Sequence, residues 1–114
     1  MTTSVEVLEG AIENLKRGWT QGIYARNKEG QPVGVLNKEA CQWCLRGALK
    51  RASEFDPAQV TSFRSLKIYM RVLQILSNST APQSLASWND EDSRTKEGVI
   101  SLLENTKGRV KSLS

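Results

Sequence analysis

The chain opens with apolar residues at helical spacing. Steps of three and four separate the first four of them: Val5, Leu8, Ile12 and Leu15. Such steps place side chains on one face of a helix. Thr3–Glu6 has the form of a capping box, in which a hydroxyl residue is followed three positions later by Glu. We therefore predict a helix over residues 4–17, closed by Gly18.

The period changes after this helix. Two short runs, residues 22–26 and 31–35, flank Asn27–Gly30, whose opening Asn and closing Gly suit a tight turn. This pattern predicts a β-hairpin at about residues 22–35. Pro32 has no N–H to donate to a ladder, so its strand is expected at an edge. An irregular loop remains an alternative.

Three further helices are predicted, at about residues 38–53, 57–77 and 91–106. Asn37 suits an N-cap for the first of these, and Asp56-Pro57 is a typical helix start. Seven apolar positions cover about half the circumference of the 57–77 helix, as expected of the central helix in a bundle. They are Phe63, Leu66, Tyr69, Met70, Val72, Leu73 and Leu76.

The remaining segments are expected to be non-helical. Pro82 lies in residues 78–87, which are rich in small and polar side chains, and we expect a connection there. The basic tail at about 107–114 is expected to fray. The fold class is therefore mainly α: a compact four-helix domain with one short hairpin between its first two helices, comprising residues 1–114 as a single domain.

Composition agrees with an ordinary globular domain. Of 114 residues, 39% are hydrophobic and 25% charged, and 16 Lys and Arg against 12 Asp and Glu give a net charge of +4. No apolar stretch approaches the length of a membrane span. The N-terminal segment is acidic where a signal peptide would be basic, so we expect a cytoplasmic protein with no membrane association.

The absence of histidine removes the commonest general base and the commonest metal ligand. No glycine-rich phosphate loop is present either. We therefore expect a protein that is not an enzyme, with no cofactor, no metal and no catalytic residue. An enzyme using Cys44 or Asp90 is the remote alternative.

Cys41 and Cys44 form a C-x2-C pair, which the helix prediction places on one helix face. Zinc needs about four ligands, and this chain offers two thiols and no imidazole. The simplest interpretation is packing by two small apolar side chains. A redox pair or a metal site shared between subunits remains open.

Basic residues gather in the middle of the sequence: Arg46, Lys50, Arg51, Arg64, Lys67 and Arg71. A surface of this kind contacts phosphates or an acidic partner. The alternative is that the row is the solvated side of two helices.

Trp43 and Trp88, together with Asn89, Asp90 and Arg94, are candidates for a pocket. Indole stacking with one arginine and one carboxylate would recognise a nucleotide-like molecule. The alternatives are that the tryptophans plug the ends of the bundle and that Asn89 or Asp90 caps the last helix.

The segment Trp43–Leu49 and the residues Trp88-Asn89-Asp90 and Arg94-Thr95, with Gly18-Trp19 upstream, resemble a family of small uncharacterised bacterial and phage domains. Its members share a W-C-x-x-G-A-L helix and a W-N-D…R-T approach to the final helix. The resemblance covers about residues 5–106 and implies no activity, since the function of the family is unknown. It implies that one set of residues belongs together: Trp43, Cys44, Gly47, Trp88, Asn89, Asp90, Arg94 and Thr95. Cys41 lies outside this pattern.

These features predict a non-enzymatic binding or regulatory protein that acts by protein–protein contact, such as a phage or mobile-element modulator of a host system. The first alternative is a small-molecule binder whose pocket is formed by Trp43, Cys44, Trp88, Asn89, Asp90, Arg94 and Thr95. The second is a nucleic-acid accessory protein that uses the basic helix surface.

Overall fold

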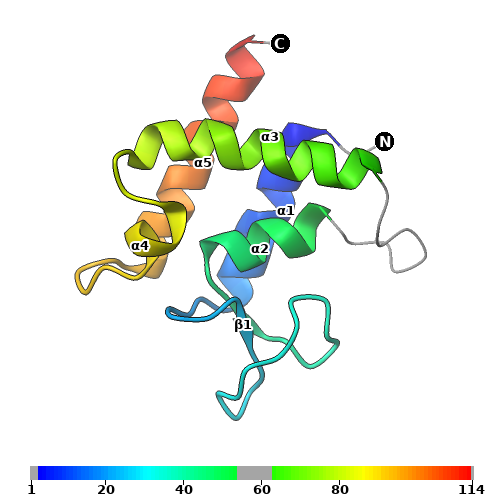
Figure 1. Ribbon diagram of the computed structural model, residues 1–114, viewed down its shortest axis with the longest axis vertical. Helices are drawn as coiled ribbons and strands as arrows, with labels where there is room; N and C mark the ends of the chain where they lie inside the picture. Colours follow the sequence, from blue (N-terminus) through cyan, green and yellow to red (C-terminus); the bar gives the residue numbers. More distant parts are fainter. Residues whose placement is uncertain (1–2, 54–62, 114) are drawn as a thin grey trace.

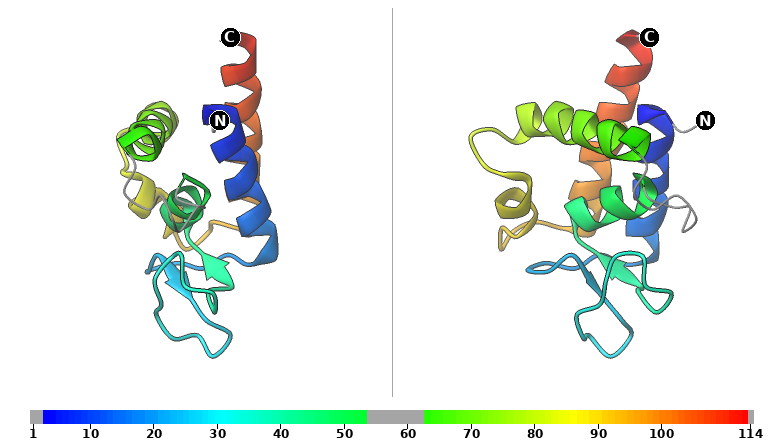
Figure 2. Two further views of the ribbon diagram at one scale, coloured as in Figure 1. Left: turned by 90° about the vertical axis from the view of Figure 1, so that its right-hand side faces the viewer. Right: turned by 45° about the vertical axis from the view of Figure 1, so that its right-hand side comes forward.

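The computed structural model describes residues 3–53 and 63–113, and its helices form two layers (Figures 1 and 2). Helices α1 (Ser4–Arg17) and α5 (Lys96–Leu113) lie side by side in one layer. Helices α2 (Leu45–Ser53), α3 (Phe63–Thr80) and α4 (Leu85–Asn89) form the other. The mainly helical prediction is confirmed, but the described residues hold five helices where four were expected.

Helix α1 has the predicted bounds, and its capping box is present. The Thr3 hydroxyl accepts from the Glu6 backbone N–H at 3.2 Å, and the Glu6 carboxylate accepts from the Thr3 N–H at 3.0 Å. The apolar face of α1 contacts α2, α3 and α5. The prediction that the 57–77 helix is central is therefore wrong, because α1 occupies that position.

The core joins α1 to α2, α3 and α5. Its fully buried members come from both helix layers and from the two strands. They are Val7, Leu8, Ala11, Leu15, Ala25, Trp43, Leu45, Ala48, Leu49, Val72, Leu76, Val99 and Leu103. On α3 only part of the predicted apolar face is buried, since Met70 is 58% exposed. The side chains of Phe63 and Leu66 lie outside the described part of the structure.

The predicted hairpin is confirmed at its turn and first antiparallel pair, but its longer ladder is formed with a different segment. The turn at Asn27–Gly30 is present, with Gly30 at φ +81° and its N–H donating to Asn27 O. Beyond that turn only one bridge, Arg26 to Pro32, joins the two runs. The antiparallel ladder instead joins β1 (Ala25–Arg26) to β2 (Gln42–Trp43).

The second helix starts later than predicted. Residues 38–44 form turns and β2 rather than helix, and α2 begins at Leu45. Asn37 caps only a local turn, in which its side chain accepts from the Glu39 N–H at 2.8 Å. Backbone pairing with β1 needs an extended chain at residues 42–43, and this pairing overrides the helix propensity of the segment.

The C-terminal half differs from the prediction at three points. Residues 78–87 include the end of α3 and the start of α4, whose N-cap Ser84 accepts from the Ser87 N–H. The last helix begins at Lys96 and not near residue 91. It continues to Leu113, so residues 107–113 are helical where a frayed tail was expected. The predicted start of the third helix, residues 57–62, lies outside the described residues.

None of the helices in the described ranges combines the length and apolar character that a membrane span needs.

Gly47 sets how closely α2 approaches the chain before β1. A Cβ built on Gly47 would lie 2.1 Å from the Tyr24 carbonyl oxygen, far inside contact distance. Gly47→Ala is therefore expected to lower the free energy of unfolding by about 2–3 kcal/mol through overpacking. Urea unfolding measures it.

The matched control is Gly108→Ala, because Gly108 is also helical but has nothing within 4 Å of the added Cβ. Here we expect a gain of about 0.5–1 kcal/mol from helix propensity. A Gly47→Ala protein as stable as the wild type would show that α2 does not approach Tyr24 this closely.

Candidate functional site

The motif residues meet where the end of α1 passes β2. The Trp43 N–H donates to Gly18 O at 3.0 Å, and the Thr20 N–H donates to Trp43 O at 3.1 Å. The approach is so close that a Cβ on Gly18 would lie 2.1 Å from the Cys41 carbonyl oxygen. The Gly18-Trp19 pair therefore anchors strand β2 through its backbone.

The side chain of Asn89, at the end of α4, is buried, and both its oxygen and its nitrogen form hydrogen bonds within the fold. Its Oδ1 accepts from the Trp19 indole at 2.8 Å and from the Leu45 N–H at 3.1 Å. Its Nδ2 donates to Thr20 O at 3.2 Å. One carboxamide thus joins α4, the segment after α1, and the first residue of α2.

Asp90 extends this cluster toward solvent. Its Oδ1 accepts from the Gly22 N–H at 2.9 Å and from the Asn89 side chain at 3.0 Å. The Gln21 side chain closes the same junction by donating to the backbone oxygens of Asn89 and Glu91. Asp90 therefore holds the 21–22 segment in place, and sequence reasoning missed Gln21 because no motif marks it.

Trp88, Arg94 and Thr95 organise the approach to α5. The Arg94 guanidinium lies 3.7 Å from the centroid of the Trp88 ring, and its Nε donates to Trp88 O at 2.8 Å. Thr95 is the residue that caps α5: its hydroxyl accepts from the Gly98 N–H at 3.0 Å. The expectation that Asn89 or Asp90 caps the last helix is wrong, because the helix starts only after Thr95.

Trp43 has no exposed surface and belongs to the core. Its indole N–H donates to Val35 O at 3.3 Å. The guanidinium groups of Arg17 and Arg51 lie 5.1 and 5.0 Å from its ring centroid, close enough for cation–π attraction. A ligand could stack on Trp43 only after these groups moved, and a pocket at the seven predicted residues stays a prediction.

A shallow open depression lies beside this cluster, on the loop between α4 and α5. Of the predicted pocket residues, Asp90 lines it. Its lining is mostly polar and acidic: Gln83, Ala86, Ser87, Asp90, Glu91, Asp92 and Ser93.

The two cysteines are free and differ in environment. Cys44 is buried directly before α2, and its Sγ accepts from the Gly47 N–H at 3.3 Å. Burial raises the pKa of the Cys44 thiol, and the Gly47 hydrogen bond only partly offsets this. Cys41 is half-buried directly before β2 and not in a helix, so the expected shared helix face does not exist. Within the described ranges, no three acidic, Cys or His side chains gather as a metal site requires.

The predicted basic surface is only partly a surface. Arg51 points to Trp43 and donates to Val35 O at 2.7 Å. Arg46 packs 5.7 Å from the centroid of the Tyr24 ring and lies close to the Tyr69 hydroxyl. Lys50, Lys67 and Arg71 are exposed, whereas the Arg64 side chain lies outside the described part of the structure. Sequence reasoning missed Tyr24 as a neighbour of this surface.

The Asn89 cluster predicts a pH-dependent defect in Asn89→Asp. At neutral pH the new carboxylate would face Thr20 O and the Asp90 carboxylate with no proton to donate, which should destabilise the fold by about 3 kcal/mol. Its folded-state pKa would be raised, so stability should recover below about pH 5 as it gains a proton. Urea unfolding at both pH values measures this. Asn78→Asp, at an exposed position of α3, is the control; equal stability of the two variants would contradict the role of Asn89.

Cys44 and Tyr69 predict a loss of stability at alkaline pH. Burial raises the pKa of both groups above the ordinary values of 9.0 and 10.0. The folded state therefore binds these protons more tightly than the unfolded state. Their contribution to stability is complete at pH values below the ordinary pKa and is lost as the pH rises through the pKa of the folded state. Urea midpoints from about pH 7 to about pH 10 should fall less steeply for Cys44→Ala than for the wild type. Parallel pH profiles would contradict this account.

A comparison with protein families places these contacts in context. The model described as "Family of unknown function (DUF6197)" matches residues 1–109. No curated protein and no solved structure matches the chain. The match covers nearly the whole sequence and agrees with the resemblance to an uncharacterised domain family. The chain belongs to the DUF6197 family of unknown function.

Proposed function

We propose that this protein is a non-enzymatic binding and regulatory protein that contacts a protein partner through one face of α2 and α3. We call this the α2–α3 face and define it by six residues: Tyr24, Arg46, Lys50, Lys67, Met70 and Arg71.

The observation that carries the proposal is the position of the exposed apolar side chains. In the described part of the chain, two large hydrophobic residues are strongly exposed, Tyr24 at 46% and Met70 at 58%. The proposed face includes both. Arg46 lies between α3 and the segment before β1, because it packs on the Tyr24 ring and lies close to Tyr69. Tyrosine, arginine and methionine are enriched in protein interfaces.

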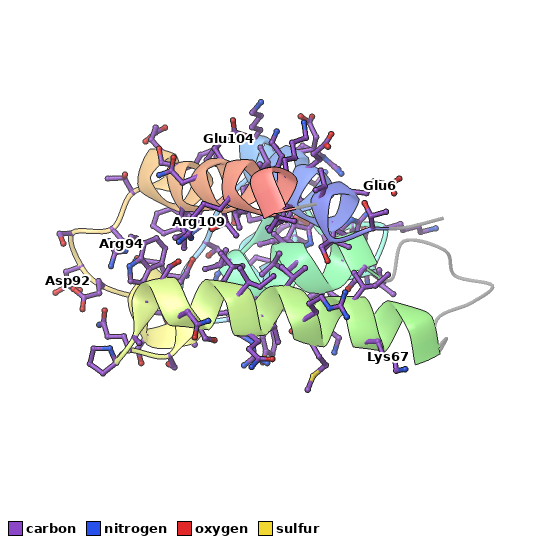
Figure 3. The ribbon with its side chains drawn as sticks, turned by 90° about the horizontal axis from the view of Figure 1, so that it is seen from above. Glu6, Lys67, Asp92, Arg94, Glu104 and Arg109 are labelled. Carbon is purple, nitrogen blue, oxygen red and sulfur yellow. The ribbon has the colours of Figure 1, made fainter. Side chains whose placement is uncertain are left out.

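Helix α3 continues the face along a single stripe. Lys67, Met70, Arg71 and Gln74 follow one another at steps of three, one and three, and all four are exposed. Figure 3 shows Lys67 on the side of α3 turned away from α1 and α5. The opposite side of α3 buries Val72 and Leu76, so one side serves the core and the other is free to contact a partner.

The non-enzymatic part of the proposal rests on how the motif residues are used. Asn89, Asp90, Arg94 and Thr95 each have hydrogen-bond partners within the fold. Cys44 is buried, and its raised pKa disfavours the thiolate that a nucleophile needs. The chain has no histidine to activate another group.

The test replaces Met70 while leaving the fold intact. Met70→Ala removes exposed apolar surface, so stability should stay within about 0.5 kcal/mol of the wild type. Affinity for a captured protein partner should fall at least about tenfold, as at an interface hot spot. Gln74→Ala, one turn along the same stripe, is the matched control.

Capture uses a photo-crosslinking amino acid in place of Gln74, with the same group in place of Lys28, an exposed residue outside the face, as the control. A protein crosslinked from position 74 and lost with Met70→Ala is the expected result. A partner crosslinked equally well in the Met70→Ala background would contradict the proposal. Crosslinking of nucleic acid at position 74 would favour the nucleic-acid alternative.

A further inference from the structure

We propose that the segment of the partner that docks on the α2–α3 face is acidic and carries an apolar side chain that covers Met70. This inference rests on the proposed function and adds the chemistry of the partner. Two observations independent of the exposed apolar side chains support it: the segregation of charge along the chain, and the uncompensated guanidinium of Arg46.

Charge is strongly segregated. Helices α2 and α3 together contain six basic residues and no acidic residue. The rest of the chain contains ten basic and twelve acidic residues, so it is slightly negative although the whole chain carries +4. Two acidic residues, Glu54 and Asp56, lie in the sequence between these helices, and four of the six basic residues belong to the α2–α3 face: Arg46, Lys50, Lys67 and Arg71. The positive charge of these four would attract an acidic partner and speed its association.

Among the described residues, Arg46 has no counter-ion within salt-bridge distance. Its neighbours are the Tyr24 ring and the Tyr69 hydroxyl, which are both neutral at physiological pH. Its Nε is buried and has no hydrogen-bond partner among the described residues. A partly buried charge without an opposite charge is costly, and a carboxylate from a partner would compensate it.

The neighbouring cations likewise form no ion pair with another described residue. In the described ranges the ion pairs are Lys16–Glu13 on α1 and Lys107–Glu104 on α5, and neither involves the α2–α3 face. Lys50, Lys67 and Arg71 therefore present charges that no carboxylate of the described chain neutralises. A second copy of the chain docked face to face would bring like charges together, which disfavours a symmetric dimer through this face.

Met70 distinguishes an acidic protein segment from a nucleic acid. A phosphate backbone gains from the cations but buries no apolar surface on a methionine that is 58% exposed. An amphipathic acidic segment satisfies both parts of the face, with carboxylates at the cations and one apolar residue on Met70 and Tyr24. Exposed methionine adapts to different apolar side chains, which suits such a contact.

The experiment measures fluorescence anisotropy of labelled probes with the full chain. The principal probe is a peptide of about 16 residues with Glu or Asp at most positions and Leu every three to four residues. Its counterparts are the same peptide with Lys for each acid, a poly-Glu peptide of equal length, and a single-stranded DNA of about 16 nucleotides.

The acidic amphipathic peptide is expected to bind, the Lys peptide not to bind, and poly-Glu to bind about tenfold more weakly because it cannot cover Met70. Affinity for the acidic peptide should fall several-fold as salt rises from about 0.05 to about 0.3 M. Lys50→Glu combined with Lys67→Glu and Arg71→Glu should weaken binding at least about tenfold. Lys28→Glu combined with Lys38→Glu, two exposed changes outside the α2–α3 face, should leave it within about twofold.

The outcomes separate this inference from the proposed function. If the acidic peptide fails to bind while position 74 still crosslinks a Met70-dependent protein, the partner is not acidic and only the inference falls. If DNA binds more tightly than the peptide and Met70→Ala has no effect, both fall in favour of nucleic acid. If no probe binds and no Met70-dependent partner is captured, both fall. A concentration-dependent dimer lost with Met70→Ala would replace the partner by a second copy and overturn the inference.

Discussion

The buried side-chain amide of Asn89 holds together parts of the chain that lie far apart in sequence. It accepts from Trp19 and from the first N–H of α2, and it donates to the carbonyl of Thr20. Each of these groups would otherwise be a polar group removed from water, and leaving one unpaired costs about 1–3 kcal/mol. The position of α4 is therefore coupled to the start of α2 and to the end of α1, and the loop that leads to α5 follows from it.

Two close backbone approaches complete this arrangement. Gly18 lets the end of α1 meet the chain at Cys41, and Gly47 lets α2 meet Tyr24. The same approach that needs Gly47 brings Tyr24 beside Arg46, which in turn contacts Tyr69 on α3. The junction inside the molecule and the exposed α2–α3 face therefore belong to one arrangement. The polar motif residues form hydrogen bonds within the junction, whereas cations and apolar side chains lie at the surface of the face.

Sequence patterns correctly predicted those parts of the fold that depend on interactions between residues close together in the sequence. The capping box at Thr3, the bounds of α1 and the Asn27–Gly30 turn depend on neighbouring residues, and all three are confirmed. The start of α2 was wrong because it depends on β2 pairing with β1 and on Asn89, which lies 44 residues from Leu45. The motif at Trp88–Thr95 was recognised as a unit in the sequence. Its role as a junction depends on hydrogen bonds from Trp19 and Gln21, and the spacing of residues in the sequence does not predict these distant partners.

Because the motif residues make their hydrogen bonds within the fold, we propose that binding takes place at the α2–α3 face. Native-state hydrogen exchange tests this most directly, because the Leu45 N–H donates to Asn89 inside the junction. If the junction opens only when the protein unfolds, the Leu45 amide should exchange at the rate of global unfolding, together with the core amides of α1. Exchange of Leu45 at the rate of an exposed loop, while α1 remains protected, would show that the junction opens independently and would contradict the claim.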